Sequence, residues 1–233
     1  MATDHRQGGS SVTRVLPERS PALNAYLDGV RAKHRGRLIF ALDATGSRQP
    51  TWDVAARIHG EMFAAAGGLV EVQLVHYRGV GKFKASEWVS SSAELQRLMA
   101  SVTCDWGDTQ ITRVLEHALG EARSQKIGAV VFVGDSVEEG TWSLYYLAEE
   151  LGKAGVPLFL FQEDDDASVE KTFRKMAELS GGAYARFDRS SADRLKSLLG
   201  AVAAYATGGR RALESYTNKQ GGEVRLLTAQ LRR

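Results

Sequence analysis

The sequence predicts a single three-layer, doubly wound α/β domain, in which helices cover both faces of a mostly parallel sheet. Two segments, residues 37–43 and 127–133, contain continuous apolar runs that are typical of central parallel strands buried on both faces. Strand-like and helix-like segments alternate from residue 37 to residue 207, with no internal linker long enough to divide them. The 233 residues, 43% of them hydrophobic and 25% charged, suffice for one sizeable core.

The first segments are expected to precede the sheet. Residues 1–19 are polar, rich in Gly and Ser, and without periodicity, which predicts a disordered arm. Residues 21–33 have the apolar spacing of a helix, with Ser20 as its N-cap. The first strand, residues 37–43, then ends in Asp43. We therefore expect the domain, including this leading helix, to cover residues 20–207.

The next segment predicts a helix followed by a hairpin. Apolar residues recur at helical spacing over residues 51–66, and two glycines end the pattern. Residues 70–77 and 82–88 alternate as strands around a turn that contains two glycines, which predicts an antiparallel pair. The second of these strands carries lysines and is expected at an edge of the sheet.

The remaining elements alternate between helices and strands. Helices are expected over residues 92–102 and from about 110 to 124, and a buried strand over residues 127–133. A helix at 141–154, a strand at 157–162, a helix at 168–180, a strand at 183–187 and a helix at 192–207 follow. The acidic run at 163–166 is a candidate second cation site. Our preferred interpretation is a solvated loop whose last carboxylate favours the start of the next helix.

The net charge of +2 is unevenly distributed along the chain. Residues 1–37 and 208–233 each carry +4, whereas residues 38–207 carry −6, so two basic ends flank an acidic body that favours cation binding. Aromatic residues are not interleaved with the terminal arginines, so nucleic acid is not favoured as a partner. The chain has one cysteine, Cys104, and no apolar run typical of a signal sequence or a membrane span. These features predict a cytoplasmic protein that does not bind a membrane.

Polar side chains gather after the buried strands, where open α/β sheets have their ligand crevice. Three loops carry carboxylates and hydroxyls there: Asp43, Thr45 and Ser47; Thr109; and Asp135 and Ser136. Gly46 permits the bend that turns alternate oxygens of the first loop toward one point. Hard cations such as Mg²⁺ prefer oxygen ligands of this kind. As an alternative, these side chains merely cap helix N-termini.

The three loops resemble the metal-ion-dependent adhesion site of the von Willebrand factor A domain family, abbreviated VWA and MIDAS. That site is written D-x-[ST]-x-S, followed by a Thr in a second loop and an Asp in a third. The matching residues, in the family's order and separations, are Asp43, Thr45, Ser47, Thr109 and Asp135. The resemblance covers about residues 37–207 and implies a six-stranded sheet of order 3-2-1-4-5-6 with one antiparallel edge strand. It also implies a divalent cation, Mg²⁺ foremost with Mn²⁺ or Ca²⁺ as alternatives, held by these five residues.

Two loops depart from the family's pattern. The second reads Gly-Asp-Thr in place of Gly-Gly-Thr, and the third reads Gly-Asp-Ser in place of Thr-Asp-Gly. Asp108 thus adds a negative charge, which attracts a cation and repels an acidic group of a partner. We expect Asp108, Trp106 and Ser136 to surround the cation without being its main ligands.

The resemblance implies a non-enzymatic, intracellular interaction module, in which a partner protein donates an Asp or Glu to the cation. One alternative is a metal-dependent phosphohydrolase of the haloacid-dehalogenase type. Such enzymes use D-x-D with the second Asp as general acid/base, and Thr45 stands at that position here. Another alternative is a metal-free scaffold that docks through the basic segment 208–233, where Leu226, Leu227 and Leu231 suggest a short helix.

Overall fold

The computed structural model describes residues 35–46, 49–58, 60–78, 81–187 and 192–231, so the arm and leading helix predicted for residues 1–33 lie outside the described residues. Its strands are β1 (Gly36–Asp43), β2 (Val70–Arg78), β3 (Lys82–Val89), β4 (Ala129–Gly134), β5 (Leu158–Glu163) and β6 (Ala183–Phe187). They form one six-stranded sheet of order β3-β2-β1-β4-β5-β6. All neighbours are parallel except β2 and β3, which are antiparallel. The predicted fold class, strand order and hairpin are confirmed.

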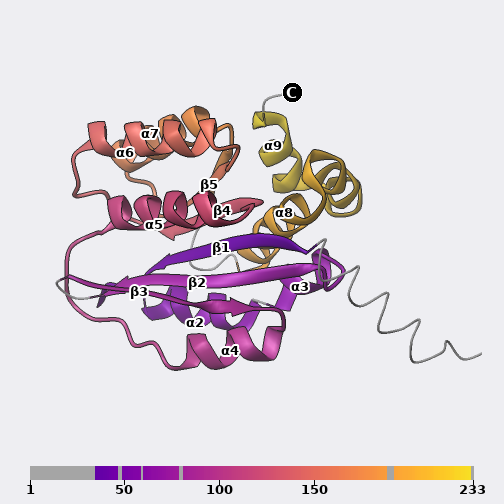
Figure 1. The fold of residues 1–233 in the computed structure, drawn as a ribbon, viewed down its shortest axis with the longest axis horizontal. Helices are drawn as coiled ribbons and strands as arrows, with labels where there is room; N and C mark the ends of the chain where they lie inside the picture. The colour runs from indigo at the N-terminus through magenta and orange to yellow at the C-terminus, as the bar shows by residue number, and fades with distance from the viewer. Residues whose placement is uncertain (1–34, 47–48, 59, 79–80, 188–191, 232–233) are drawn as a thin grey trace, which may run out of the picture. The chain divides into compact units, whose positions relative to one another are not determined.

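Helices cover both faces of the sheet (Figure 1). One face packs against α5 (Ile111–Ser124), α6 (Thr141–Lys153) and α7 (Ala167–Ser180). The other packs against α2 (Gln49–Ile58), α3 (Gly60–Ala65), α4 (Ser92–Ala100), α8 (Ala192–Gln220) and α9 (Gly222–Gln230). The helix predicted for residues 51–66 corresponds to α2 and α3, and residue 59 between them lies outside the described residues. Among the described residues, no helix is long and apolar enough to cross a membrane.

The central strands are apolar throughout because each of their two faces meets a helical layer. In β1, Phe40 belongs to the core on the α8 face and Ile39 to the core on the α5 face, and both side chains are fully buried. In β4, Val131 and Phe132 divide in the same way. This two-sided burial explains the continuous apolar runs in these strands. Polar and apolar residues do not alternate here, because neither face of the strand is exposed to solvent.

Helix α8 lies close to the sheet beside two glycines, Gly36 at the start of β1 and Gly128 just before β4. A Cβ atom placed on Gly36 or Gly128 would lie 2.3 or 2.4 Å from the carbonyl oxygen of Ala206. A side chain at either position would therefore push α8 away from β1 and β4. The backbone of α8 departs from helical geometry at Gly208 and Gly209, where Gly209 has a φ of 61°. The helix bends at this point.

The segment after this bend packs on the same core, so the prediction that the domain ends at residue 207 is wrong. Buried apolar side chains extend the core into this segment: Leu213, Tyr216, Val224, Leu227 and Leu231. Burying them is favourable because each removes apolar surface from water. Of the three leucines proposed for a docking helix, only Leu226 is exposed.

The acidic run after β5 starts a helix, as the preferred interpretation expects. The Asp166 carboxylate accepts hydrogen bonds from the backbone N–H groups of Ser168 and Val169, at 2.7 and 3.0 Å. These bonds satisfy donors that the first turn of α7 leaves without a helical partner. Glu163, however, is fully buried as the last residue of β5, so the run as a whole is not a solvated loop.

Candidate functional site

The first loop of the predicted site begins at the carboxyl end of β1. Asp43 is the last residue of the strand and is only 2% exposed. Its Oδ1 accepts the backbone N–H of Thr45 at 2.8 Å, which closes a tight turn directly after the strand. Thr45 is half-buried, and Ser47 lies outside the described residues. This hydrogen bond thus holds the backbone of Thr45 next to the carboxylate of Asp43.

The loop before α5 lies alongside this turn. The N–H of Asp105 donates to the carbonyl of Ala44 at 3.1 Å, and Thr45 and Asp105 form an isolated parallel bridge. Trp106 is 87% exposed, and a Cβ atom on Gly46 would lie 3.7 Å from its indole ring. The second loop therefore places an exposed aromatic ring beside the first motif.

Asp105 joins this loop to the edge of the sheet. Its Oδ2 accepts from Lys82 Nζ at 3.0 Å, and its Oδ1 accepts from the N–H of Trp106 at 2.9 Å. The hydrogen bond from Lys82 foremost, and then the one from Trp106, holds the pKa of this carboxyl below its usual value. Asp105 is thus a charged group that sequence analysis did not single out.

The third loop starts beside the first because β4 is the neighbour of β1 in the sheet. Leu42 pairs with Val133 in register, and a Cβ atom on Gly134 would lie 3.7 Å from the Cβ of Asp43. Asp135 and Ser136 follow and are half-buried, whereas Asp108 in the second loop is exposed. The strand order thus brings the ends of β1 and β4, with the two aspartates, to one edge of the sheet.

Two glutamates that the sequence analysis did not select connect the third loop to the second. Glu138 and Thr109 bond reciprocally: the Thr109 N–H donates to Glu138 Oε2 at 2.7 Å, and the Glu138 N–H donates to Thr109 Oγ1 at 3.1 Å. The Glu139 carboxylate accepts the N–H groups of Ile111 and Thr112 at 2.8 and 2.6 Å. The N-terminus of α5 is therefore capped by a residue from the loop after β4, and its own N-cap residue makes no side-chain bond to it.

The donor set at this edge of the sheet fits a hard cation. In the described part of these loops, it consists of the carboxylate and hydroxyl oxygens of Asp43, Thr45, Thr109 and Asp135. Thr109 is buried, and its hydroxyl oxygen accepts one N–H from Glu138, which leaves a second lone pair for another interaction. Among the described residues, no group of three or more His, Cys, Asp or Glu is placed to hold a metal ion. A cation here would therefore depend on the hydroxyls as well as on Asp43 and Asp135.

Replacing Glu139 by glutamine is expected to lower the free energy of unfolding by about 1–2 kcal/mol. The amide keeps one acceptor oxygen but loses the negative charge and one of the two bonds to the N-terminus of α5. Urea denaturation would measure the change. Glu116→Gln is the matched control, because Glu116 is exposed in the middle of the same helix. Equal losses in the two variants would contradict a capping role for Glu139.

Comparison with known proteins shows similarity in structure. No protein-family model and no curated protein matches the chain. An aerotolerance-related membrane protein from Bacteroides fragilis matches with a TM-score of 0.54 and 17% identity, over 79% of this chain and 100% of the other. The VWA domain of SpRpn10 matches with a TM-score of 0.53 and 12% identity, over 73% and 94%. Proximal thread matrix protein 1 from the mussel byssus, in a structure with a zinc-occupied MIDAS motif, matches with a TM-score of 0.58 and 15% identity, over 72% and 46%.

Proposed function

Because the described chain has the von Willebrand factor A fold, we propose that it is a non-enzymatic protein-interaction module with a divalent cation at the carboxyl edge of its sheet. The proposed ligands are the two strand-end aspartates and three hydroxyl residues: Asp43, Thr45, Ser47, Thr109 and Asp135. The observation that carries the proposal is the buried Asp43 carboxylate at the end of β1, with Thr45 bonded to it. A structural neighbour with zinc in its MIDAS motif supports the same interpretation.

The protein's own residues would orient the site. Glu138 holds Thr109 by two reciprocal hydrogen bonds, so the threonine hydroxyl is positioned before any ligand arrives. When bound, a divalent cation supplies an open coordination position that an oxygen ligand of a partner can fill. Mg²⁺ is the proposed cation because the donor set is all oxygen.

The surroundings of the site suggest how a partner protein would bind. Trp106 offers a large exposed aromatic surface beside the first motif, and such residues are common at the centres of protein interfaces. The exposed carboxylate of Asp108 would disfavour a second acidic group nearby. We therefore propose a partner that inserts one Asp or Glu side chain and otherwise contacts Trp106. The proposed compartment is the cytoplasm, for a chain with a single cysteine.

Adding Mg²⁺ after treatment with a chelator is expected to raise the melting temperature of the wild-type protein and not that of Asp43→Asn. A cation at one hundred times its Kd stabilises the folded state by about 2.7 kcal/mol when it does not bind the unfolded chain. Scanning calorimetry with Mg²⁺, Mn²⁺, Ca²⁺ and Zn²⁺ would measure the effect. Asp165→Asn, at an exposed carboxylate beyond β5, is the matched control and is expected to respond like the wild type.

Two results would contradict this proposal. In the first, none of the four cations raises the melting temperature of the chelator-treated wild type. In the second, the protein hydrolyses a phosphomonoester with Mg²⁺ and Asp43→Asn abolishes turnover, which would favour the phosphohydrolase alternative. A pull-down from the native cell, with and without chelator, would identify the partner and test whether its binding depends on the cation.

A further inference from the structure

A second candidate site lies on the other side of Asp105, at the edge of the sheet formed by β3. A pocket of about 330 Å³ opens there between the β2–β3 hairpin and the end of α4, lined by His76, Arg78, Lys82, Lys84, Ser101 and Val102. We refer to it as the basic edge pocket. Its volume is at the lower end of the range typical of small-molecule sites.

The hairpin register places three cationic side chains and one buried imidazole in two directly opposed pairs. His76 pairs with Lys84, and Arg78 pairs with Lys82. Opposed residues of an antiparallel pair have their side chains on the same face of the sheet, and the like charges of Arg78 and Lys82 destabilise their pair. The arrangement therefore concentrates positive charge on one wall of the pocket. A bound anion would relieve the repulsion between these charges.

Little negative charge on the protein balances this wall. Lys82 pairs with Asp105 at 3.0 Å. Arg78 Nη1 donates to the carbonyl and the hydroxyl oxygens of Thr103, at 3.0 and 2.7 Å, and both acceptors are neutral. In the described part of the chain, Lys84 has no carboxylate within ion-pair distance and its side chain is exposed. The wall therefore carries a net positive charge that is available to a ligand.

His76 is the second sign that the pocket is built for a polar ligand. The residue is only 7% exposed, and its ring meets that of Trp52 edge-on at 5.7 Å. Its Nδ1 is buried and has no hydrogen-bond partner among the residues that the structure describes. A buried polar atom without a partner costs free energy, so packing alone does not explain a histidine here.

The end of α4 does not compete for these cations. Helix C-termini attract positive charge through their free carbonyl groups. Here the Leu98 carbonyl accepts from Ser101 Oγ at 2.7 Å, and the Met99 carbonyl accepts from Trp52 Nε1 at 3.1 Å. Donors from the protein already occupy these acceptors.

We propose that the basic edge pocket binds a small molecule that carries a phosphate group. Arg and Lys side chains form strong charge-assisted hydrogen bonds to phosphate oxygens, and Lys82, Lys84 and Arg78 offer such donors around one cavity. The proposal does not depend on the cation site, which lies at the carboxyl ends of β1 and β4.

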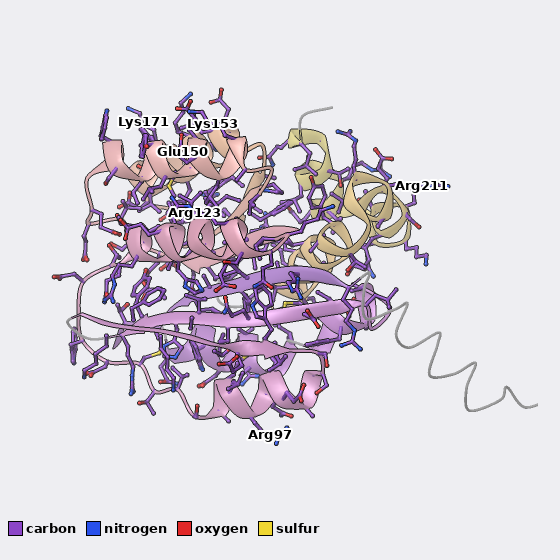
Figure 2. The ribbon with its side chains drawn as sticks, viewed as in Figure 1. Arg97, Arg123, Glu150, Lys153, Lys171 and Arg211 are labelled. Atoms are coloured by element: carbon purple, nitrogen blue, oxygen red, sulfur yellow. The ribbon has the colours of Figure 1, made fainter. Side chains whose placement is uncertain are left out.

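Isothermal titration of the full chain with inorganic phosphate, in a divalent-free buffer at constant ionic strength, tests this proposal. We expect saturable binding by the wild type and about tenfold weaker binding by Lys84→Met, which removes one charge-assisted contact. Lys171→Met is the matched control, because Lys171 is exposed on α7 (Figure 2). Helix α7 covers the face of the sheet opposite to α4 and the pocket. We expect it to bind phosphate as the wild type does. Asp43→Asn should also keep phosphate binding, whatever its response to Mg²⁺.

Several outcomes would overturn the proposal. Phosphate binding that does not saturate, or that Lys171→Met weakens as much as Lys84→Met, would show general attraction to positive charge. Loss of binding in Asp43→Asn would place the anion elsewhere. A parallel sedimentation assay uses phosphatidylcholine vesicles with and without phosphatidic acid. Binding to the phosphatidic acid vesicles without binding to free phosphate would indicate a membrane surface instead of a small molecule.

Discussion

Replacing Phe132 by alanine is expected to lower the free energy of unfolding by about 3–5 kcal/mol, the largest effect that we predict. The side chain is fully buried in β4. Its ring stacks on Tyr77 with centroids 6.3 Å apart and meets Phe173 edge-on at 5.7 Å. Alanine would leave a cavity between β2, β4 and α7, and these elements cannot collapse into it without breaking the strand pairing.

Urea denaturation followed by circular dichroism would measure this loss. Trp142→Ala is the matched control, because Trp142 is 79% exposed and stacks on Tyr146, with centroids 5.9 Å apart. We expect the control to lose less than about 1 kcal/mol. A Phe132→Ala variant as stable as the control would show that this core rearranges without a cavity.

Lowering the pH from 7.5 to 5 is expected to destabilise the wild type by about 2 kcal/mol more than His76→Gln. Burial foremost, with the charges of Arg78 and Lys84, lowers the pKa of His76 from 6.5 to about 4. Between these two values the unfolded chain binds a proton that the folded chain does not. The stability that depends on neutral His76 is therefore fully present above pH 6.5. It is lost as the pH falls toward 4.

Urea denaturation of both proteins at the two pH values would measure this difference. Carboxylates titrate in both proteins, so their contribution cancels in the comparison, and glutamine does not titrate. Equal losses in the wild type and in His76→Gln would contradict the lowered pKa of His76. At pH 7.5, the difference in the free energy of unfolding between the two proteins would also measure the effect of replacing the buried imidazole by a neutral amide.

Much of the fold follows from local sequence. Periodicity identified the six strands, and the apolar runs of β1 and β4 showed that these strands are central. The helix expected over residues 51–66 is helical on both sides of residue 59, in α2 and α3. The end of the domain was less well predicted. The domain was predicted to end at residue 207, yet the chain continues past the bend at Gly208 and Gly209 onto the same core.

The candidate site was predicted in part. Its loops follow from the positions of Asp43, Thr109 and Asp135 after strands or before a helix, and the strand order brings the ends of β1 and β4 together. Glu138 and Glu139 were missed. Their partners lie about thirty residues earlier, at the start of α5, and no local pattern links an acidic pair to a distant helix terminus.

Local sequence is enough to predict the fold class, the central strands and the polar residues after each strand, because these depend on periodicity and on short-range geometry. The folded structure was needed to show which distant groups meet. Glu139 bonds the start of α5, Asp105 pairs with Lys82, and His76 lies opposite Lys84. The physical reason is that hydrogen bonds, ion pairs and strand register act between neighbours in space. Such neighbours are set by the packing of the whole chain, which no single segment encodes.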